Sequence, residues 1–421
     1  MRALPFISLL LLTLTACAPG QMPDGWDWNA PKEAAAEPPA PLQRNKDFDQ
    51  RLAAISQKLE TEQRPWQSGP SQPNGSDRTQ PVEQAPLGAA PIKVALIVPL
   101  SGAQKDLGNS MMVAGQMALQ DLRVKAIELL PRDSGDTPAS AEAAVKSAIN
   151  EGAKLVLGPV FAEQVKTAGR ASTVPLIGFT TDWTAASNNT FVMGFLPYEQ
   201  VRRVADFAAE RQATGLLVVA PDSPYGRAVA RTATEYNKLP TKMLIAQPAD
   251  TINMMVAKIR AQLTPQTALL IAYDGVTTRR LVANLSAAGI TPKTNLLLGT
   301  GLLDDPQLAS AREVEGVYFA SAPTAQRARF ESRYRSVANK QPARLASLAY
   351  DATALAAVVA ASSGNPSSPF SIADIKDTNG FAGVDGIFRF QDNGLVSRGL
   401  AILTWQAGQL REISPAPASF Q

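Results

Sequence analysis

From residue 92 onward, the sequence alternates between short apolar runs and amphipathic stretches of helical length. The first run, Ile92–Val98, is followed by the loop Pro99–Gly102 and by apolar residues at helical spacing as far as Leu122. The alternation continues to the run Leu296–Leu298. Strands that alternate with helices predict a mainly parallel sheet that helices cover on both faces. We therefore expect an α/β fold.

The alternating segments fall into two series, the second of which begins with a helix near Tyr198. The predicted strands are Ile92–Val98, Ile127–Leu130, Leu155–Leu157, Leu176–Phe179, Gly215–Ala220, Lys242–Ala246, Ala268–Ala272 and Leu296–Leu298. The helices between them include Pro138–Glu151, Ala162–Ala171, Arg227–Asn237, Met254–Leu263 and Thr277–Ala288. Two series of this length predict two doubly wound lobes, and one very large sheet is the alternative.

The N-terminus has the pattern of a secretory signal. Arg2 precedes an apolar run that is too short to span a membrane, and the run ends in Leu14-Thr15-Ala16-Cys17. This ending resembles the lipobox of bacterial lipoproteins, which implies cleavage after residue 16 and lipidation of Cys17. A buried structural Cys beside an ordinary cleavage site is the alternative. Because Ala18 follows in place of Asp, the resemblance favours the outer membrane, with the protein facing the periplasm.

Residues 17–91 are rich in Pro, Gln, Ala, Glu and Ser, and we expect a lipidated Cys followed by a disordered, Pro-rich tether. Within it, a short helix is predicted near residues 45–63, where four apolar residues alternate at steps of four and three: Phe48, Leu52, Ile55 and Leu59. A marginal, solvated helix is the alternative. The tether also contains Trp26, Trp28 and Trp66, which are candidates for contact with a partner; the first two also suit the lipid headgroup zone.

The composition excludes several chemistries. The 421 residues contain no His and one Cys, so a Ser-His-Asp triad, a Cys-His pair, an internal disulfide and a Cys/His zinc site are all excluded. The formal net charge of +3 argues against a nucleic-acid-binding face. Nucleophile-elbow, phosphate-loop and dinucleotide motifs are absent. Paired carboxylates such as Asp133 and Asp136 fit loops better than a glycosidase site, so we predict a protein that is not an enzyme and that needs no cofactor or metal.

A series of short motifs occurs in the order seen in type I periplasmic binding proteins, and the chain resembles their leucine/isoleucine/valine-binding branch. The motifs are Pro99-Leu100-Ser101-Gly102, Gly158-Pro159, Val174-Pro175-Leu176-Ile177, Asp222-Ser223-Pro224-Tyr225-Gly226, Leu302-Leu303-Asp304-Asp305-Pro306, Ala349-Tyr350-Asp351-Ala352 and Phe390-Gln391-Asp392-Asn393-Gly394. The resemblance implies two Rossmann-like lobes joined by three crossovers. We place the first lobe at residues 92–196 and 323–380, the second at residues 197–322 and 381–413, and a tail at residues 414–421.

Candidate ligand-binding residues follow from the predicted strand ends, because ligands of open α/β sheets bind outside the carboxyl ends of the strands. In the first lobe these residues are Ser101, Phe161, Thr180 and Thr181, and in the second lobe they are Tyr225, Tyr273, Asp274 and Thr300. For each of them the alternative is an ordinary loop residue that bonds to nearby backbone.

Two departures from the family pattern argue against amino-acid binding. Amino-acid-binding members have small hydroxyl residues after the Gly-Pro of the third strand, where this chain has Phe161. They also have an acidic residue in the loop after the last strand of the second lobe, whereas this chain reads Gly299-Thr300-Gly301. Burial of a ligand ammonium without a counter-charge is costly.

The lipobox, the tether and the binding-protein domain together are similar to the outer-membrane lipoproteins that activate penicillin-binding proteins. This similarity implies a regulator of peptidoglycan synthesis whose partner is a class A penicillin-binding protein. The helical repeats that precede the domain in better-studied activators are not found in residues 18–91. The alternative is the substrate-binding protein of an ABC importer for amino acids or related small polar solutes, with a small molecule in the cleft.

Overall fold

The computed structural model describes residues 90–363, 365 and 367–420. The predictions for Cys17, Trp26, Trp28, Trp66 and the helix near residues 45–63 lie outside the described residues. Over the part that is described, none of the helices combines the length and the apolar character that a membrane crossing requires.

The first lobe is built on a sheet of five parallel strands in the order β2-β1-β3-β4-β5. The strands are β1 (Ile92–Val98), β2 (Ile127–Asp133), β3 (Leu155–Leu157), β4 (Leu176–Gly178) and β5 (Thr190–Val192). In the register, Val94 of β1 pairs with Leu129 of β2 on one side and Leu155 of β3 on the other. Because all five strands run the same way, the loops that follow them lie along one edge of the sheet.

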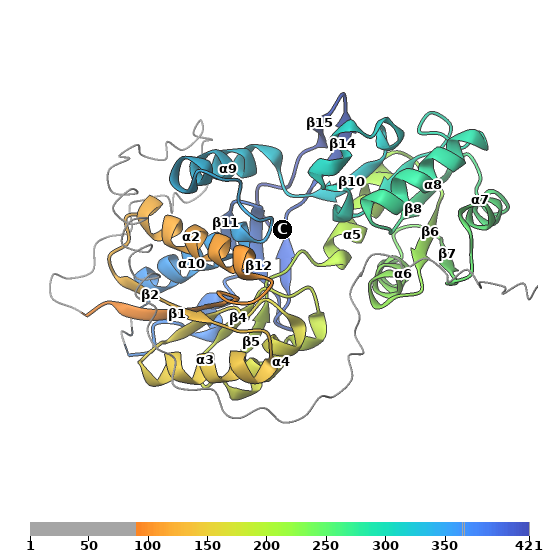
Figure 1. Ribbon diagram of the computed structural model, residues 1–421. Helices are drawn as coiled ribbons and strands as arrows, with labels where there is room; N and C mark the ends of the chain where they lie inside the picture. The colour runs from red at the N-terminus through yellow and green to blue at the C-terminus, as the bar shows by residue number, and fades with distance from the viewer. Residues whose placement is uncertain (1–89, 364, 366, 421) are drawn as a thin grey trace, which may run out of the picture. The chain divides into compact units, whose positions relative to one another are not determined.

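Helices cover both faces of this sheet (Figure 1). On one face lie α3 (Pro138–Asn150) and α4 (Ala162–Ala171), and on the other lie α2 (Lys105–Asp121) and α10 (Ala346–Ser362). Helix α9 (Thr324–Ala338) packs against the α2 side through Phe330, Tyr334 and Val337, and α11 (Ile372–Ile375) follows α10. The Ala-rich sequence of α10 allows this helix to approach its neighbours closely.

The second lobe contains a sheet of seven strands in the order β15-β14-β10-β9-β8-β6-β7. The strands are β6 (Gly215–Pro221), β7 (Thr241–Ala246), β8 (Thr267–Ile271), β9 (Leu297–Gly299), β10 (Tyr318–Ser321), β14 (Ala401–Gln406) and β15 (Gln409–Ser414). The strands from β6 to β10 are parallel, whereas β14 pairs antiparallel with both β10 and β15.

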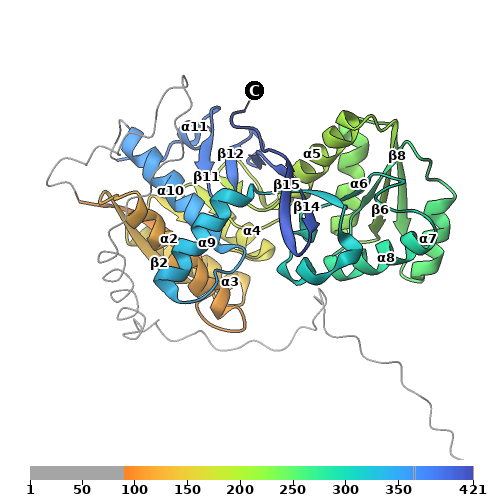
Figure 2. The same ribbon diagram turned by 90° about the horizontal axis from the view of Figure 1, so that it is seen from above.

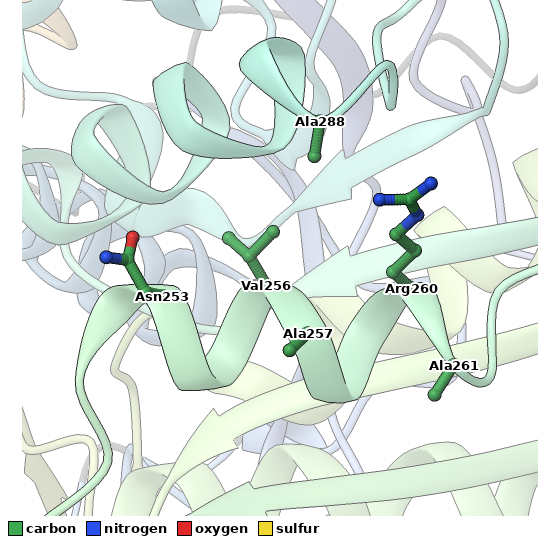
Figure 3. Close-up of a pocket in the computed structure, with 6 residues that line it drawn as sticks. All are labelled: Asn253, Val256, Ala257, Arg260, Ala261 and Ala288. Atoms are coloured by element: carbon green, nitrogen blue, oxygen red, sulfur yellow. The ribbon is translucent and has the colours of Figure 1, made fainter.

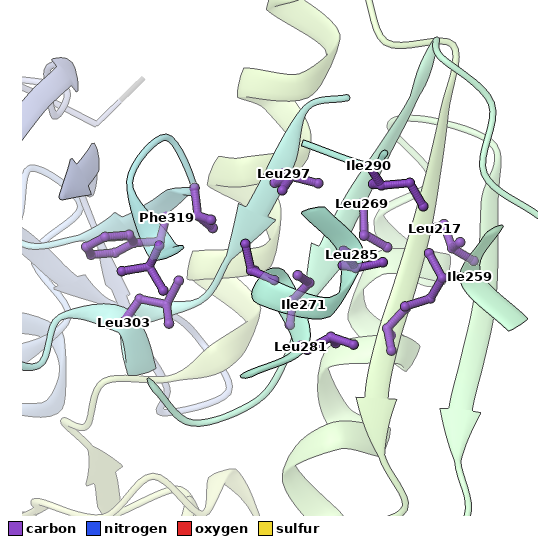
Figure 4. Packing of buried hydrophobic residues seen from close by; sticks show 14 of the residues in the cluster. Leu217, Ile259, Leu269, Ile271, Leu281, Leu285, Ile290, Leu297, Leu303 and Phe319 are labelled. Carbon is purple, nitrogen blue, oxygen red and sulfur yellow. The ribbon is translucent and has the colours of Figure 1, made fainter. Parts of the chain in front are cut away.

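Side chains of this second sheet alternate between two apolar cores. Leu217 and Val219 of β6 face one core, to which α7 (Ile252–Arg260) and α8 (Gly275–Ala287) contribute (Figure 4). Leu216 and Val218 face the other core, together with α5 (Pro197–Glu210) and α6 (Pro224–Tyr236). This two-sided burial explains the continuous apolar runs in the sequence. Short 3-10 helices, η2 (Gly301–Leu303), η3 (Pro306–Ser310) and η4 (Arg312–Val314), close the first core.

The stretch 381–413, which is predicted to lie in one lobe, is divided between two sheets. The strands β11 (Phe381–Gly383), β12 (Gly386–Phe390) and β13 (Val396–Arg398) form a separate three-stranded sheet. Gly394 O accepts a hydrogen bond from Val192 N of β5 at 2.9 Å, which places this small sheet against the first lobe. Strands β14 and β15 lie instead with β10, as Figure 1 also shows. Figure 2 shows β14 and β15 apart from β11 and β12.

The expected α/β architecture with two lobes is confirmed. The chain crosses between the lobes between β5 and α5, between β10 and α9, and between β13 and β14, which are the three expected crossovers. Several bounds are those predicted, including β1, β3 and α4. The three-residue strand β5 was not predicted, because such a short apolar run carries no clear period.

Candidate functional site

The first-lobe candidates lie in the loops at the carboxyl edge of the five-stranded sheet. Ser101 and Thr181 are exposed, and Phe161 is half-buried at the N-terminus of α4. Thr180 is buried, and its Oγ1 accepts a hydrogen bond from Asp182 N at 3.1 Å. The side chain of Thr180 is therefore already bonded to the backbone of its own loop.

In the second lobe, the structure brings two of the four candidates into contact. Tyr225 begins α6, Thr300 follows β9, and the Tyr225 hydroxyl donates a hydrogen bond to Thr300 Oγ1 at 2.7 Å. Thr300 is fully buried, and burial raises the pKa of Tyr225 to about 12. The two hydroxyl groups are thus bonded to each other at the carboxyl ends of β6 and β9, with β8 between these two strands.

Tyr273 and Asp274 also have local partners. The Tyr273 hydroxyl lies 3.5 Å from Met255 Sδ, and burial together with the negative charge of Asp250 raises the pKa of Tyr273 to about 12. Asp274 is the N-cap of α8: its carboxylate accepts hydrogen bonds from Thr277 N at 2.9 Å and from Thr277 Oγ1 at 2.8 Å. An N-cap explains this residue without any ligand.

The two carboxylates that follow β9, Asp304 and Asp305, also accept hydrogen bonds from other groups of the protein. Asp304 accepts hydrogen bonds from Ser321 Oγ and from the guanidinium of Arg327, and the side chains of the Asp304–Arg327 pair are only 6% and 11% exposed. Asp305 is the N-cap of η3 and accepts a hydrogen bond from Gln307 N at 2.9 Å. The loop between β9 and η3 therefore offers no unpaired carboxylate to a ligand ammonium.

The paired carboxylates near the end of β2 have structural roles. Asp133 Oδ1 accepts hydrogen bonds from Leu100 N at 2.8 Å and Gly135 N at 2.9 Å, so it ties the loop after β1 to the loop after β2. A Cβ on Gly102, which has φ of +68°, would lie 2.4 Å from Asp136 Oδ2, so these two loops are in close contact. Across the described ranges, no cluster of three or more metal-ligating side chains is found.

A buried cluster of charges lies where the first and third crossovers meet, and sequence reasoning missed it. Its members are Asp351 of α10, Asp385 of the β11–β12 turn, Arg398 of β13, and Arg344 before α10. Arg344 Nη1 donates a hydrogen bond to Asp385 Oδ1 at 3.0 Å, and Arg398 Nη1 lies 3.9 Å from Asp351 Oδ2. The one sequence signal for this cluster is the motif Ala349-Tyr350-Asp351-Ala352, which by itself indicates only the family resemblance.

The pKa values of the two acids of this cluster are shifted in opposite directions. Burial and the negative charge of Asp385 raise the pKa of Asp351 to about 7, against the opposing effect of Arg398. Burial acts on Asp385 in the same sense, but the positive charges of Arg344 and Arg398 and a hydrogen bond from Ser347 outweigh it and lower the pKa of Asp385. Two neighbouring buried carboxylates are thus separated in acidity by their different distances from the guanidinium groups.

Aromatic rings complete the cluster. The guanidinium carbon of Arg344 lies 4.0 Å from the ring centroid of Phe195, and that of Arg398 lies 5.4 Å from the centroids of both Phe195 and Phe388. Beside Arg398 is a cavity of about 10 Å³ that Glu199 and Gln200 also line. A space of this size holds roughly one water molecule, so the cluster has no room for a metabolite.

An open groove lies on the outer surface of the second lobe, away from the predicted site residues (Figure 3). Its volume is about 410 Å³, and it is lined by Asn253, Val256, Ala257, Arg260, Ala261 and Ala288. Val256 and Arg260 project from α7 toward the end of α8, where Ala288 lies. No predicted ligand-binding residue lines it.

Comparison with known proteins gives a family match over most of the chain. The family model described as "Periplasmic binding protein" matches residues 91–409. A search of curated proteins gives no match.

Solved structures of similar fold include both solute receptors and a regulator. A putative branched-chain amino acid ABC transporter protein from Rhodospirillum rubrum has a TM-score of 0.69 and 19% identity, over 77% of this chain and 100% of that one. The isoleucine complex of LivJ from Streptococcus pneumoniae has a TM-score of 0.54 and 20% identity, over 78% and 100%. The C-domain of LpoA from Haemophilus influenzae, described as a regulator of PBP1A, has a TM-score of 0.61 and 14% identity, over 76% and 99%.

Proposed function

Because this chain belongs to the periplasmic binding protein family, we propose that it is a lipid-anchored lipoprotein that regulates a class A penicillin-binding protein through protein contact. In this proposal Cys17 carries the lipid in the outer membrane, and the lobes reach into the periplasm on the Pro-rich tether. In this proposal the protein acts by contact with the synthase and does not deliver a solute to a permease.

The observation that carries this proposal is the hydrogen bond between Tyr225 and Thr300. A receptor directs polar groups at its ligand from the strand ends, and these groups are only partly satisfied until the ligand binds. In this chain the hydroxyl groups of Tyr225 and Thr300 pair with each other at 2.7 Å. Thr180 and Asp274 bond to backbone N–H groups of their own loops, and Asp304 is paired with Arg327.

The likeness to LpoA, whose C-domain is described as a regulator of PBP1A, supports the same reading. At 14% identity this likeness concerns the fold. It nevertheless establishes that a domain of this architecture is found in a protein described as a regulator.

The second candidate function is that of a solute receptor, which the likeness to branched-chain amino acid binding proteins favours. For an amino acid, this reading requires a carboxylate to face the ligand ammonium. The stretch Gly299–Leu303 contains none, and Asp304 is held by Ser321 and Arg327. Exposed Ser101 and Thr181 remain available for a neutral solute.

The two functions are separated by one pair of assays on the mature-length chain from Ala18, prepared without lipid. A regulator increases the rate at which a class A synthase polymerises or crosslinks glycan strands, and it shows no ligand-dependent stabilisation. A receptor leaves the synthase rate unchanged and shows a higher melting temperature with an amino acid, amide or peptide, because ligand binding to the native state stabilises it.

A further inference from the structure

Within three residues of the third crossover, the contacts of the chain change from the three-stranded sheet to the core of the second lobe. Arg398, the last residue of β13, is 6% exposed and lies among Asp351, Asp385, Phe195 and Phe388. Apart from Phe195, which belongs to the first crossover, these are residues of α10 or of the three-stranded sheet.

At the next two residues, the contacts of the chain change from the small sheet to the second lobe. Gly399 N donates a hydrogen bond to Ile387 O of β12 at 2.9 Å, so it is still held by the small sheet. Leu400 O accepts a hydrogen bond from Arg203 Nε of α5 at 3.1 Å, and the Leu400 side chain packs in the second-lobe core. The boundary between the two sets of partners therefore lies between Gly399 and Leu400.

The small sheet is attached to the first lobe by the same cluster. Val384 N donates a hydrogen bond to Asp351 Oδ1 at 2.7 Å, and Arg344 is paired with Asp385. A Cβ on Gly383 would lie 2.5 Å from Asp351 Oδ2, so the β11–β12 turn rests directly on the carboxylate of α10. The rings of Phe191 and Phe390 add a contact at 5.0 Å between centroids.

Arg398 is held there by charge and by ring faces rather than by hydrogen bonds to protein groups. Among the described atoms, its three guanidinium nitrogens have no hydrogen-bond partner. A buried guanidinium is tolerated only with compensating charge, which Asp385 supplies and to which Asp351 adds when it is ionised. If Arg398 leaves the cluster, Asp351 and Asp385 lose one of the guanidinium groups that balance them, and Arg344 and Arg327 remain. The position of Arg398 is thus coupled to the position of α10 and of the β11–β12 turn.

We propose that Arg398 is a clamp that fixes the three-stranded sheet β11–β13 to the first lobe and sets the hinge of the third crossover at Gly399–Leu400. In any movement between the lobes, the small sheet moves with α10, whereas β14 and β15 move with α5. A regulator and a receptor need this hinge equally, so the proposal does not rest on the proposed function.

The test is hydrogen–deuterium exchange on the mature-length chain from Ala18, compared with Arg398→Met. The variant keeps a flexible, unbranched apolar side chain and removes the guanidinium group with its charge. Peptides that cover residues 381–399 are expected to exchange at least tenfold faster in the variant, while peptides that cover residues 401–406 keep their rates. The matched control is Arg411→Met, because Arg411 is exposed on β15 and should change neither set.

Unchanged rates over residues 381–399 in the Arg398→Met variant would overturn the clamp, and so would an equal acceleration of residues 401–406. A second measurement does not depend on whether that variant folds. In the unmodified chain at rising urea concentrations, residues 381–399 should lose protection together with α10. Loss of protection together with β14 would contradict the proposal.

Discussion

The guanidinium of Arg398 and the carboxyl group of Asp351 form a buried pair whose Nη1 and Oδ2 atoms are 3.9 Å apart. The distance is long for an ion pair, and a second carboxylate, Asp385, acts on both members. Asp351 therefore keeps its proton to about pH 7 instead of about pH 4. A proton held by the native state makes stability depend on pH.

The free energy of unfolding should fall as pH rises from 5 to 7. In this window the unfolded chain has released the Asp351 proton, whereas the folded chain retains it, because its pKa is raised to about 7. The slope contributed by one such group is at most about 1.4 kcal/mol per pH unit. Burial raises the pKa values of Asp121 and Glu199 as well, so these residues act in the same direction. Asp385 has a lowered pKa, so its titration falls below this window.

Asp351→Asn is the variant that isolates this effect, since the amide cannot titrate. Urea unfolding at pH 5, 6 and 7 should give a shallower dependence of unfolding free energy on pH in the variant than in the unmodified chain. The same slope in both proteins would show that Asp351 does not hold a proton in the native state.

The pair between Asp304 and Arg327 should be far more important for stability than an exposed pair. Asp304→Ala removes the buried carboxylate that bonds to Arg327 and leaves Glu331, 3.6 Å from Arg327 Nε, as its nearest partner. Removal of one member of a buried pair typically costs up to about 3–5 kcal/mol. The control is Glu235→Ala, which breaks the exposed pair of Arg231 and Glu235, whose side chains are 74% and 61% exposed; this change should cost less than about 0.5 kcal/mol. Chemical denaturation measures both, and equal losses would contradict the burial argument.

The hydrogen bond between Tyr225 and Thr300 should behave as a structural contact. Tyr225→Phe and Thr300→Val should each lower the unfolding free energy by about 1 kcal/mol, and the double variant should lose less than the sum. If the proposed function is correct, Tyr225→Phe stimulates the synthase as well as the unmodified chain does. Additive losses in the double variant would mean that the two hydroxyl groups do not interact.

Gly108 should tolerate no side chain. It lies in α2, and a Cβ there would approach Pro99 O to 1.7 Å, so Gly108→Ala must push the helix away from the loop after β1. We expect a loss of more than about 1 kcal/mol, in the range of overpacked cores. Gly215→Ala in β6 is the control, because its Cβ would lie 3.4 Å from Pro240 O, an ordinary contact. Equal melting temperatures for the two variants would contradict this packing.

Local sequence patterns predicted the regular part of the fold well. The strands β1 and β3 are largely buried and appear in the sequence as apolar runs, and apolar residues at helical spacing predicted the helices between them. The candidate residues were placed at strand ends because parallel strands share one carboxyl edge. The sequence does not show that Tyr225 and Thr300 bond to each other, since 75 residues separate them.

The buried charge cluster could not be predicted from the sequence. Asp351 and Asp385 are charged residues in segments that read as an ordinary helix and an ordinary turn, and Arg398 ends a strand with no apolar alternation to mark it. Their burial results from the packing of α10 against the small sheet, which is a contact between distant parts of the chain. The same distant contact divides the stretch 381–413 between two sheets.

Direct binding between this protein and a class A penicillin-binding protein tests the central claim most directly. Isothermal titration calorimetry with the mature-length chain from Ala18 and the periplasmic part of the synthase should give saturable, one-to-one binding with a micromolar or tighter Kd. Absence of binding, together with a melting temperature that rises when a small polar solute is added, would contradict the account and favour a receptor.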